Sequence, residues 1–347
     1  MKTLDEVEAR VIVNESNTPG DDANSFIITE PGSYYLIGNL VGTQDKHGVS
    51  IRANDVTLDL NGFALVGIPG TPTSGVDVPV NQSGLCIRDG CIRGWTGGGV
   101  QARTSVTFVE KLRVSDSAVG ILVGNGSLVK DCLASGNEIG FSLTDRTQIV
   151  DCIATVNSSY GFQATSYVTI IDCTASRNYG GAGIVVDNGC TIIRCSSTRS
   201  LPSGSGIIVG AGCNVVDCVS ANNGRNGYVV GAGSVIRNCL TRANVGVGIH
   251  VIGDDCLVTD NTCVDNNQGI VVKTSGSRVE ANSCVANKVG GFDIAGVRNI
   301  VVRNSSRGSF ANTFFGSSQD VLGPSVAMGG GEIPINSPWA NFSILDS

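Results

Sequence analysis

Glycine and apolar positions recur through most of this chain with a period near 21 residues. A Gly-apolar-x-apolar pattern begins at ten glycines, which are Gly99, Gly120, Gly140, Gly161, Gly183, Gly206, Gly227, Gly248, Gly269 and Gly291. Eight cysteines follow 20 to 24 residues apart, namely Cys132, Cys152, Cys173, Cys195, Cys218, Cys239, Cys263 and Cys284. Self-similarity at such a fixed period is typical of a repeat architecture. The pattern therefore predicts one solenoid rather than several globular domains.

Each repeat is expected to contain two or three short strands. In the segment GILVGNGSLVKDCLASGN, Ile121 and Val123 alternate with Leu122, a pattern that predicts a strand with two inward residues. Gly and Asn residues then form turns on both sides of a second strand that ends near Cys132. A repeat of this length has no room for a helix and lacks the leucine-rich signature. The pattern predicts an all-β parallel β-helix of about 11–12 turns of ~21 residues.

Two inward columns support this prediction. The first apolar position reads Val100, Ile121, Phe141, Phe162, Ile184, Ile207, Tyr228, Ile249, Ile270 and Phe292. The third reads Ala102, Val123, Leu143, Ala164, Val186, Val209, Val230, Val251, Val272 and Ile294. We also expect a stacked asparagine column in the turns, formed by Asn137, Asn157, Asn178, Asn223, Asn244, Asn267 and Asn287.

The period also suggests where the coil begins and ends. Residues 1–47 are expected to form an N-terminal cap, residues 48–309 the β-helix, and residues 310–347 a C-terminal cap. Residues 68–83 contain three prolines and are expected to overhang as a loop insertion.

The composition of the chain argues against two classes of binding partner. The formal net charge of −7 argues against a nucleic-acid partner, because phosphate binding needs clustered Lys and Arg. It also disfavours anionic membrane surfaces, and no apolar run is long enough to span a bilayer. The first ten residues, MKTLDEVEAR, lack the apolar region of a signal peptide.

The cysteine spacing argues against a disulfide framework. Residues one turn apart lie roughly 4.8 Å apart with parallel side chains, whereas a disulfide needs Cβ atoms about 3.8 Å apart and angled together. We therefore expect a stack of free thiols that act as small core residues.

The chain resembles bacterial right-handed parallel β-helix repeat proteins. The resemblance lies in GVSIRANDVTLDLNGFALVG at 48–67, IRDGCIRGW at 87–95, NTPGD at 17–21, PGSYYL at 31–36 and SPWANF at 337–342. It implies a right-handed coil and a secreted or cell-surface location. Members of this family mostly have no assigned activity, and the same pectate-lyase-like superfold includes lyases, glycosidases and epimerases that act on polysaccharides.

The residue signatures of those enzymes are absent from this sequence. The chain lacks the Gly-His-Gly and Arg-Ile-Lys motifs of polygalacturonases. It also lacks the Trp-Ile-Asp-His motif of pectate lyases and the Asp-Pro-His motif of epimerases. The strongest catalytic candidate is His250, which lies between two inward positions, with Asp254 and Asp255 in the next turn and Lys273 one repeat later. A histidine beside carboxylates and a lysine could carry out acid–base chemistry on a uronate.

A column of aspartates is the candidate for a cation site. Asp131, Asp151, Asp172 and Asp217 recur at one position, with Arg194 among them. We expect a solvated or corner-turning column and no resident cofactor. Ca²⁺ is the ion for which such a column could supply some oxygen ligands.

Half of the outward column between the two inward ones is apolar. Leu122, Val185, Ile208, Val229 and Val271 predict either an interface with another copy of the chain or a surface covered by its tail.

Taken together, these features favour an extracellular or cell-surface β-helix with a carbohydrate-interacting or structural role. The alternative is a polysaccharide lyase or related uronate-acting enzyme whose residues differ from the known signatures. Polysaccharide is the expected partner in both cases.

Overall fold

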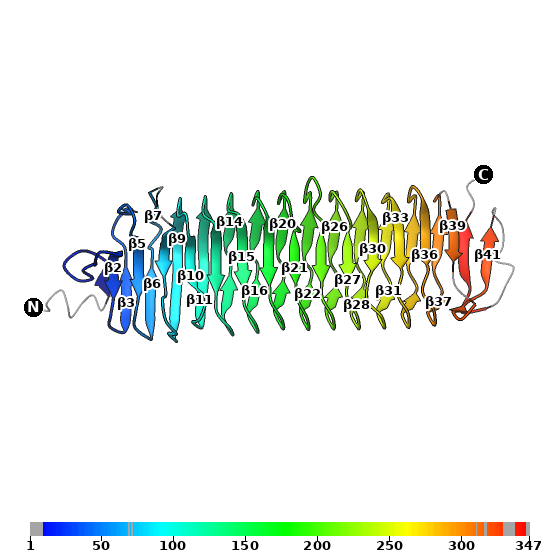
Figure 1. Cartoon of the computed structure of the whole chain (residues 1–347), viewed down its shortest axis with the longest axis horizontal. Coiled ribbons are helices and arrows are strands. Elements are labelled where there is room, and N and C mark those ends of the chain that lie inside the picture. The colour runs from blue at the N-terminus through cyan, green and yellow to red at the C-terminus, as the bar shows by residue number, and fades with distance from the viewer. Residues whose placement is uncertain are drawn as a thin grey trace, which may run out of the picture. The chain divides into compact units, whose positions relative to one another are not determined.

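A computed structural model describes residues 10–68, 70, 72–309, 311–315, 318–328 and 337–344. The chain divides into two compact units, Met1–Thr174 and Ala175–Ser347. In each unit parallel strands from successive turns lie side by side (Figure 1). No helix in these residue ranges is long and apolar enough to cross a membrane.

In each unit one strand of each turn belongs to one sheet, whose outer surface we call the broad face of that unit. Within the described residues each unit contributes seven such strands. In the first unit they are β2 (Asn24–Ile28), β5 (His47–Ile51), β8 (Ser74–Asp77), β10 (Gly98–Ala102), β12 (Val119–Val123), β15 (Ile139–Leu143) and β18 (Tyr160–Ala164). In the second unit they are β21 (Ile184–Val186), β24 (Ile207–Val209), β27 (Tyr228–Val230), β30 (Val247–Val251), β33 (Gln268–Val272), β36 (Gly290–Ile294) and β39 (Ala311–Phe315).

The other strands of each turn form two further rows. In the first unit they are β1 (Val11–Ile12), β3 (Gly32–Tyr35), β4 (Leu40–Val41), β6 (Val56–Asp59), β7 (Ala64–Val66), β9 (Leu85–Arg93), β11 (Thr107–Ser115), β13 (Leu128–Lys130), β14 (Leu133–Ser135), β16 (Gln148–Val150), β17 (Ile153–Thr155) and β19 (Thr169–Ile171). Strand β20 (Thr174–Ser176) lies where the chain passes into the second unit. The remaining strands are β22 (Thr191–Ile193), β23 (Ser196–Thr198), β25 (Asn214–Val216), β26 (Val219–Ala221), β28 (Val235–Arg237), β29 (Leu240–Arg242), β31 (Leu257–Thr259), β32 (Thr262–Val264), β34 (Arg278–Glu280), β35 (Ser283–Val285), β37 (Ile300–Val302), β38 (Ser305–Arg307), β40 (Val321–Leu322), β41 (Ser325–Met328) and β42 (Asn341–Ile344).

Equivalent residues of successive turns pair in register, which places like side chains in columns. Ile121 of β12 pairs with Val100 of β10 and with Phe141 of β15. Both inward columns predicted from the sequence are buried throughout. In the first unit the rings of Phe141 and Phe162 stack with centroids 4.9 Å apart. The repeat therefore builds its core from stacked identical positions, as the alternation predicted.

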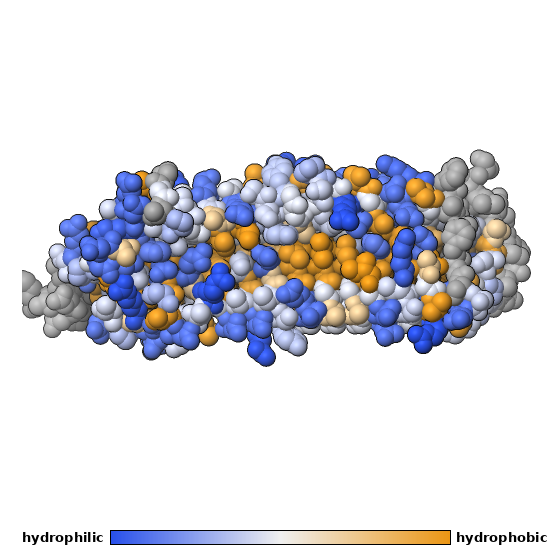
Figure 2. Space-filling model, in the orientation of Figure 1, coloured by the Kyte–Doolittle hydropathy of each residue, from blue (hydrophilic) through white to orange (hydrophobic). Residues whose placement is uncertain are grey.

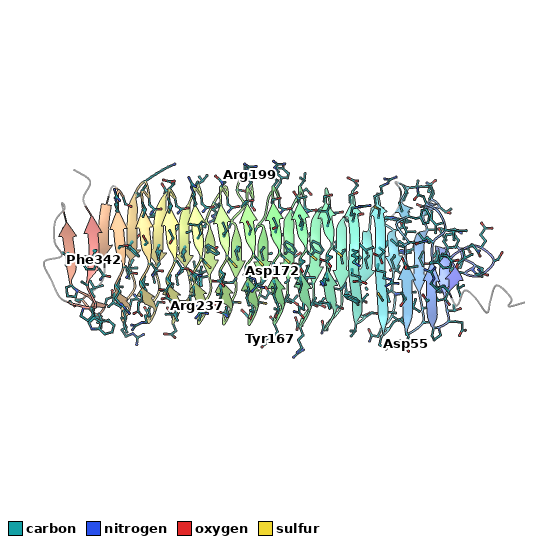
Figure 3. The ribbon with its side chains drawn as sticks, turned by 180° about the vertical axis from the view of Figure 1, so that it is seen from behind. Asp55, Tyr167, Asp172, Arg199, Arg237 and Phe342 are labelled. Carbon is teal, nitrogen blue, oxygen red and sulfur yellow. The ribbon has the colours of Figure 1, made fainter. Side chains whose placement is uncertain are left out.

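Three corners turn the chain, and at nearly every one a residue has left-handed backbone geometry. Corner I, which follows the broad-face strand, contains Asp55, Gly84, Gly126, Arg146 and Tyr167, and later Gly189, Gly212, Gly233, Asp255, Gly276 and Arg298. Corner II contains Asn61, Asp89, Lys111, Asp131, Asp151 and Asp172, and later Arg194, Asp217, Asn238, Asp260, Ala281 and Arg303. Corner III contains Gly94, Asp116, Gly136 and Val156, and later Arg177, Arg199, Asn222, Ala243, Asp265, Ala286 and Gly308. In Figure 3 Asp55 and Tyr167 lie along one edge of the first unit, and Asp172 lies away from that edge.

At most corners a buried side chain follows the left-handed residue and stacks on its equivalent in the next turn. After corner III this residue is asparagine in most turns, and the column contains Asn266 where the sequence pattern suggested Asn267. The reason is that the left-handed residue of that turn is Asp265, so the next residue points inward. After corner II the column begins with cysteines and continues as Asn261, Asn282 and Asn304.

The column of stacked cysteines therefore contains fewer residues than the eight that the sequence spacing predicted. Cys132, Cys152, Cys173, Cys195, Cys218 and Cys239 follow corner II, each after a left-handed residue. Cys263 and Cys284 instead lie in the middle of β32 and β35, where Thr241 pairs with Cys263. All the cysteines lie within the described residues as thiols outside any disulfide, and only Cys86 and Cys91 among them are not fully buried.

The coil is longer than the expected 11–12 turns, because seven turns in each unit give about 14. Residues 24–41, expected in the N-terminal cap, form β2, β3 and β4, which pair with β5, β6 and β7. Residues 68–83, expected as an overhanging loop, contain β8, which pairs with β5 and β10. Strands β39, β40 and β42 extend the coil into the expected C-terminal cap. Residues 1–9, 310, 316–317, 329–336 and 345–347 of the two caps lie outside the described residues.

Candidate functional site

His250 occupies the middle of β30 on the broad face of the second unit. It pairs in register with Val229 of β27 and Val271 of β33. The imidazole is half-buried, and burial lowers its pKa, with further lowering from the charges of Lys273 and Arg225. Burial and nearby positive charges both disfavour the imidazolium, so His250 is neutral at pH 7.

The structure therefore brings two of the four predicted site residues, His250 and Lys273, together and adds a second cation, Arg225. Lys273 is exposed directly after β33, and Arg225 is exposed in the turn before β27. We name Arg225, His250 and Lys273 the basic cluster. Arg225 was missed from the sequence because alternation assigns side-chain direction within strands only, and this residue lies in a turn.

Asp254 and Asp255 lie in the corner after β30 and bond to the neighbouring turn. The amide N–H of Ser275 donates to Oδ1 of Asp254 over 2.8 Å. Asp255 has left-handed backbone geometry, and its N–H donates to the carbonyl of Ser275 over 2.9 Å. The interactions described for these residues stabilise the turn, whereas the charges that shift His250 come from Lys273 and Arg225. A shared acid–base role for His250, Asp254, Asp255 and Lys273 stays a prediction.

The apolar residues of the outward column are not all accessible. Val185, Ile208 and Val229 are only partly buried and pair along β21, β24 and β27. Figure 2 shows apolar side chains gathered over these strands on the broad face. By contrast, Leu122 and Val271 are buried.

Polar neighbours explain the burial of these two residues. Gln101 and Ser142 flank Leu122 in register, and His250 and Asp293 flank Val271. We name Val185, Ile208 and Val229 the apolar stripe. These three are the partly exposed members of the five-residue set, and an interface through that set stays a prediction.

A second cluster of titratable residues lies on the broad face of the first unit. Ser50 of β5 pairs in register with Asp77 of β8. Burial raises the pKa of Asp77, and the charges of His47 and Arg52 oppose that rise. The side chains of His47, Arg52 and Asp77 therefore lie close enough to interact electrostatically. We name them the acid–base cluster.

Hydrogen bonds hold the acid–base cluster in place. The amide N–H of Ser74 donates to Nδ1 of His47 over 3.1 Å and so fixes the orientation of the imidazole ring. Arg52 donates through Nε to Oγ of Ser50 over 3.4 Å and through Nη2 to Asp21 over 3.1 Å. The Asp21 carboxylate accepts bonds from Asn24, Ala23 and Arg52, which lower its pKa to about 2.

The sequence pattern obscured this cluster for one physical reason. Residues 68–83 were expected to form a loop and residues 1–47 a cap, so Asp77 and His47 had no predicted place on a sheet. The strand signal in Ser74–Asp77 is only four residues long and is followed by Pro79.

The aspartate column lies at corner II and turns the chain. Asp131, Asp151, Asp172 and Asp217 all have left-handed backbone geometry and exposed side chains. Aspartate tolerates this geometry better than most residues do. Across the described ranges no group of three or more His, Cys, Asp and Glu side chains gathers as a metal site.

Comparison with known proteins supports the fold. The solved structures that resemble the chain include two A-modules of mannuronan C-5 epimerases from Azotobacter vinelandii. The AlgE4 module has a TM-score of 0.52 at 14% identity, with 90% of this chain and 88% of that chain covered. The AlgE6 module has a TM-score of 0.50 at 13% identity, with 91% of each chain covered. At these identities the likeness establishes the fold alone.

No curated protein matches the sequence. The family described as "Right handed beta helix region" matches residues 74–214 and 163–307, which together span more than half of the chain. This match confirms the right-handed coil that the resemblance in the sequence implied. The chain belongs to the right-handed β-helix family.

Proposed function

We propose that this protein binds an acidic polysaccharide outside the cell, on the broad face of the second unit. The observation that supports the proposal is the basic cluster: Lys273 and Arg225 lie close enough to His250 to lower its pKa. Such a concentration of positive charge is notable in a chain of net charge −7. It suits a ligand that presents carboxylates at regular spacing.

The apolar stripe adds a second element that suits a polysaccharide. Val229 pairs with His250 in register, so the stripe continues directly into the basic cluster. A uronate chain has carboxylates along its edges and C–H groups on its ring faces. The basic residues can pair with the carboxylates while the aliphatic residues contact the ring faces.

We expect the double substitution Arg225→Gln and Lys273→Gln to weaken binding of polygalacturonate or alginate about tenfold. Two exposed ion pairs contribute up to about 1 kcal/mol each, and about 1.4 kcal/mol corresponds to a factor of ten. Calorimetric titration at low and high salt measures this effect, which should shrink as salt rises.

The matched control is the double substitution Arg199→Gln and Arg237→Gln. It changes the net charge equally, and both arginines are visible from the side opposite to the view of Figure 1 (Figure 3). Equal weakening by both double variants would indicate a general charge effect and contradict a site at the basic cluster. Binding to neither polysaccharide, together with concentration-dependent self-association, would instead assign the apolar stripe to a second copy of the chain.

A second candidate function is a uronate-acting enzyme, and the acid–base cluster is the observation that favours it. Asp77 has a raised pKa, so its carboxyl holds a proton to higher pH than an exposed aspartate does. Arg52 lies nearby and could hold a substrate carboxylate. Turnover would be measured by the absorbance of unsaturated products and by new reducing ends.

If the chain has this activity, Asp77→Asn is expected to lower turnover by about 10²–10⁴-fold without lowering stability at pH 7. The raised pKa makes ionisation of Asp77 favour unfolding once the pH exceeds the unfolded-state value near 3.8. A neutral amide avoids that penalty, so the melting temperature of the variant should equal or exceed that of the parent at pH 7. The difference should disappear at a pH well below 3.8.

Asp89→Asn is the control, because Asp89 is a corner II residue whose left-handed geometry asparagine also tolerates. A marked fall in melting temperature for Asp77→Asn at pH 7 would contradict the argument for Asp77. In the same assay His250→Ala tests the basic cluster as the alternative catalytic group.

A further inference from the structure

A groove of about 400 Å³ lies at the C-terminal end of the second unit. Its volume is within the range of about 300–1,000 Å³ that small-molecule sites occupy. Nine residues line it, which are Arg278, Ile300, Val302, Val321, Leu322, Gly323, Pro324, Ser337 and Trp339. The groove lies away from the basic cluster in sequence and shares no residue with it.

The groove exposes an unusual amount of apolar surface. Trp339 is 50% exposed, and Val321 and Leu322 of β40 are also exposed. Strand β40 pairs with β37, which supplies Ile300 and Val302 to the same groove. A half-exposed indole beside aliphatic side chains provides a surface suited to the apolar face of a ligand.

Polar groups at the edge of the groove are held in place. The Arg278 guanidinium donates to the Glu280 carboxylate, which also accepts a bond of 3.1 Å from Nη1 of Arg303. These bonds lower the pKa of Glu280, so its carboxylate is ionised at neutral pH and is shared by Arg278 and Arg303. The backbone N–H of Trp339 donates to Oγ of Ser337 over 3.3 Å, which leaves the hydroxyl proton of Ser337 for a ligand.

We propose that this groove binds one pyranose ring of a neutral, hexose-based oligosaccharide. The ring stacks one C–H face on Trp339 and lies over the aliphatic residues, while Arg278 and Ser337 donate hydrogen bonds to its hydroxyl groups. A neutral sugar fits because Arg278 is already paired with the Glu280 carboxylate, which an anionic ligand would also approach, and because the other lining residues are uncharged. The site is separate from the acidic-polysaccharide site proposed above.

The chain offers a direct spectroscopic test, because it contains two tryptophans. Trp95 is buried with 2% exposure, whereas Trp339 is half-exposed. Titration of the full chain with cellohexaose, maltohexaose and mannohexaose is expected to shift the emission to shorter wavelength with at least one of them. The same sugar should protect the exposed tryptophan from acrylamide quenching.

Two variants test whether the change in emission comes from Trp339. Trp339→Phe is expected to lose the spectral change while retaining most of the affinity in calorimetry, because an aromatic ring remains. Trp339→Ala is expected to weaken binding about tenfold, on the scale of one aromatic contact. The Arg225→Gln and Lys273→Gln double variant should respond as the parent does, so failure of one proposed site is distinguishable from failure of the other.

Three results would overturn the proposal. The first is the absence of any spectral or calorimetric response to the three neutral sugars. The second is that, without sugar, acrylamide quenches Trp339 as little as it quenches Trp95. That result would mean that the groove is already filled. The third is protection that grows with protein concentration in the absence of sugar, which would assign the groove to a second copy of the chain.

Discussion

Replacing Asn266 with leucine is expected to lower the free energy of unfolding by about 3–5 kcal/mol. The Oδ1 atom of Asn266 accepts bonds from the backbone N–H of Asn244 over 3.1 Å and from its Nδ2 over 2.9 Å. Its own Nδ2 donates to the carbonyl of Thr241 and to Oδ1 of Asn287, each over 3.2 Å. Leucine would remove the acceptor of the buried Asn244 backbone N–H and the side-chain donor to the Thr241 carbonyl, at about 1–3 kcal/mol each.

Urea denaturation followed by circular dichroism measures this loss. Asn267→Ala is the matched control, because Asn267 is the adjacent residue, is not fully buried, and is the position that the sequence spacing assigned to the column. We expect the control to change stability by less than about 0.5 kcal/mol. Equal effects of the two substitutions would contradict the assignment of Asn266 to the buried column.

Replacing Gly248 with alanine is expected to cost about 3 kcal/mol, at the upper end of typical overpacking. An added Cβ would lie 2.6 Å from the carbonyl oxygen of Gly269 in the next turn and 2.9 Å from Cγ2 of Thr241. The backbone oxygen cannot move aside without disturbing the strand pairing between turns. The recurring glycine is therefore required by close contact between turns, and Gly248 has no positive φ that would demand glycine.

Gly233→Asn separates this steric requirement from a conformational one. Gly233 has a φ of 63°, and nothing lies within 4 Å of an added Cβ. Asparagine adopts left-handed geometry readily, so we expect a change of less than about 0.5 kcal/mol in the same urea experiment. A loss as large as that of Gly248→Ala would contradict the steric explanation.

The stacking of turns could be predicted from the sequence because it depends on local periodicity. Val100, Ile121 and Phe141 each begin a triplet of inward, outward and inward positions, and that triplet recurs every 20 or 21 residues. Burial of both inward columns follows directly, since in-register parallel pairing places equivalent residues next to one another. The turns of the coil that the sequence pattern did not predict contain strands with little apolar alternation, such as the four-residue strand β8.

The candidate sites depend on corner geometry and on contacts between turns, which the periodicity of the sequence does not determine. The sequence pattern by itself determined a parallel β-helix with stacked core columns and with His250 on an outward strand position, and the resemblance to a known family implied its right-handedness. Only the tertiary structure placed Asp265 in left-handed geometry and so moved the buried column to Asn266. Only the tertiary structure also brought Arg225 towards His250, and Asp77 towards His47 and Arg52. Corner geometry determines where a side chain points after a turn, and contacts between turns determine which charged groups lie close together. The spacing of apolar residues determines neither.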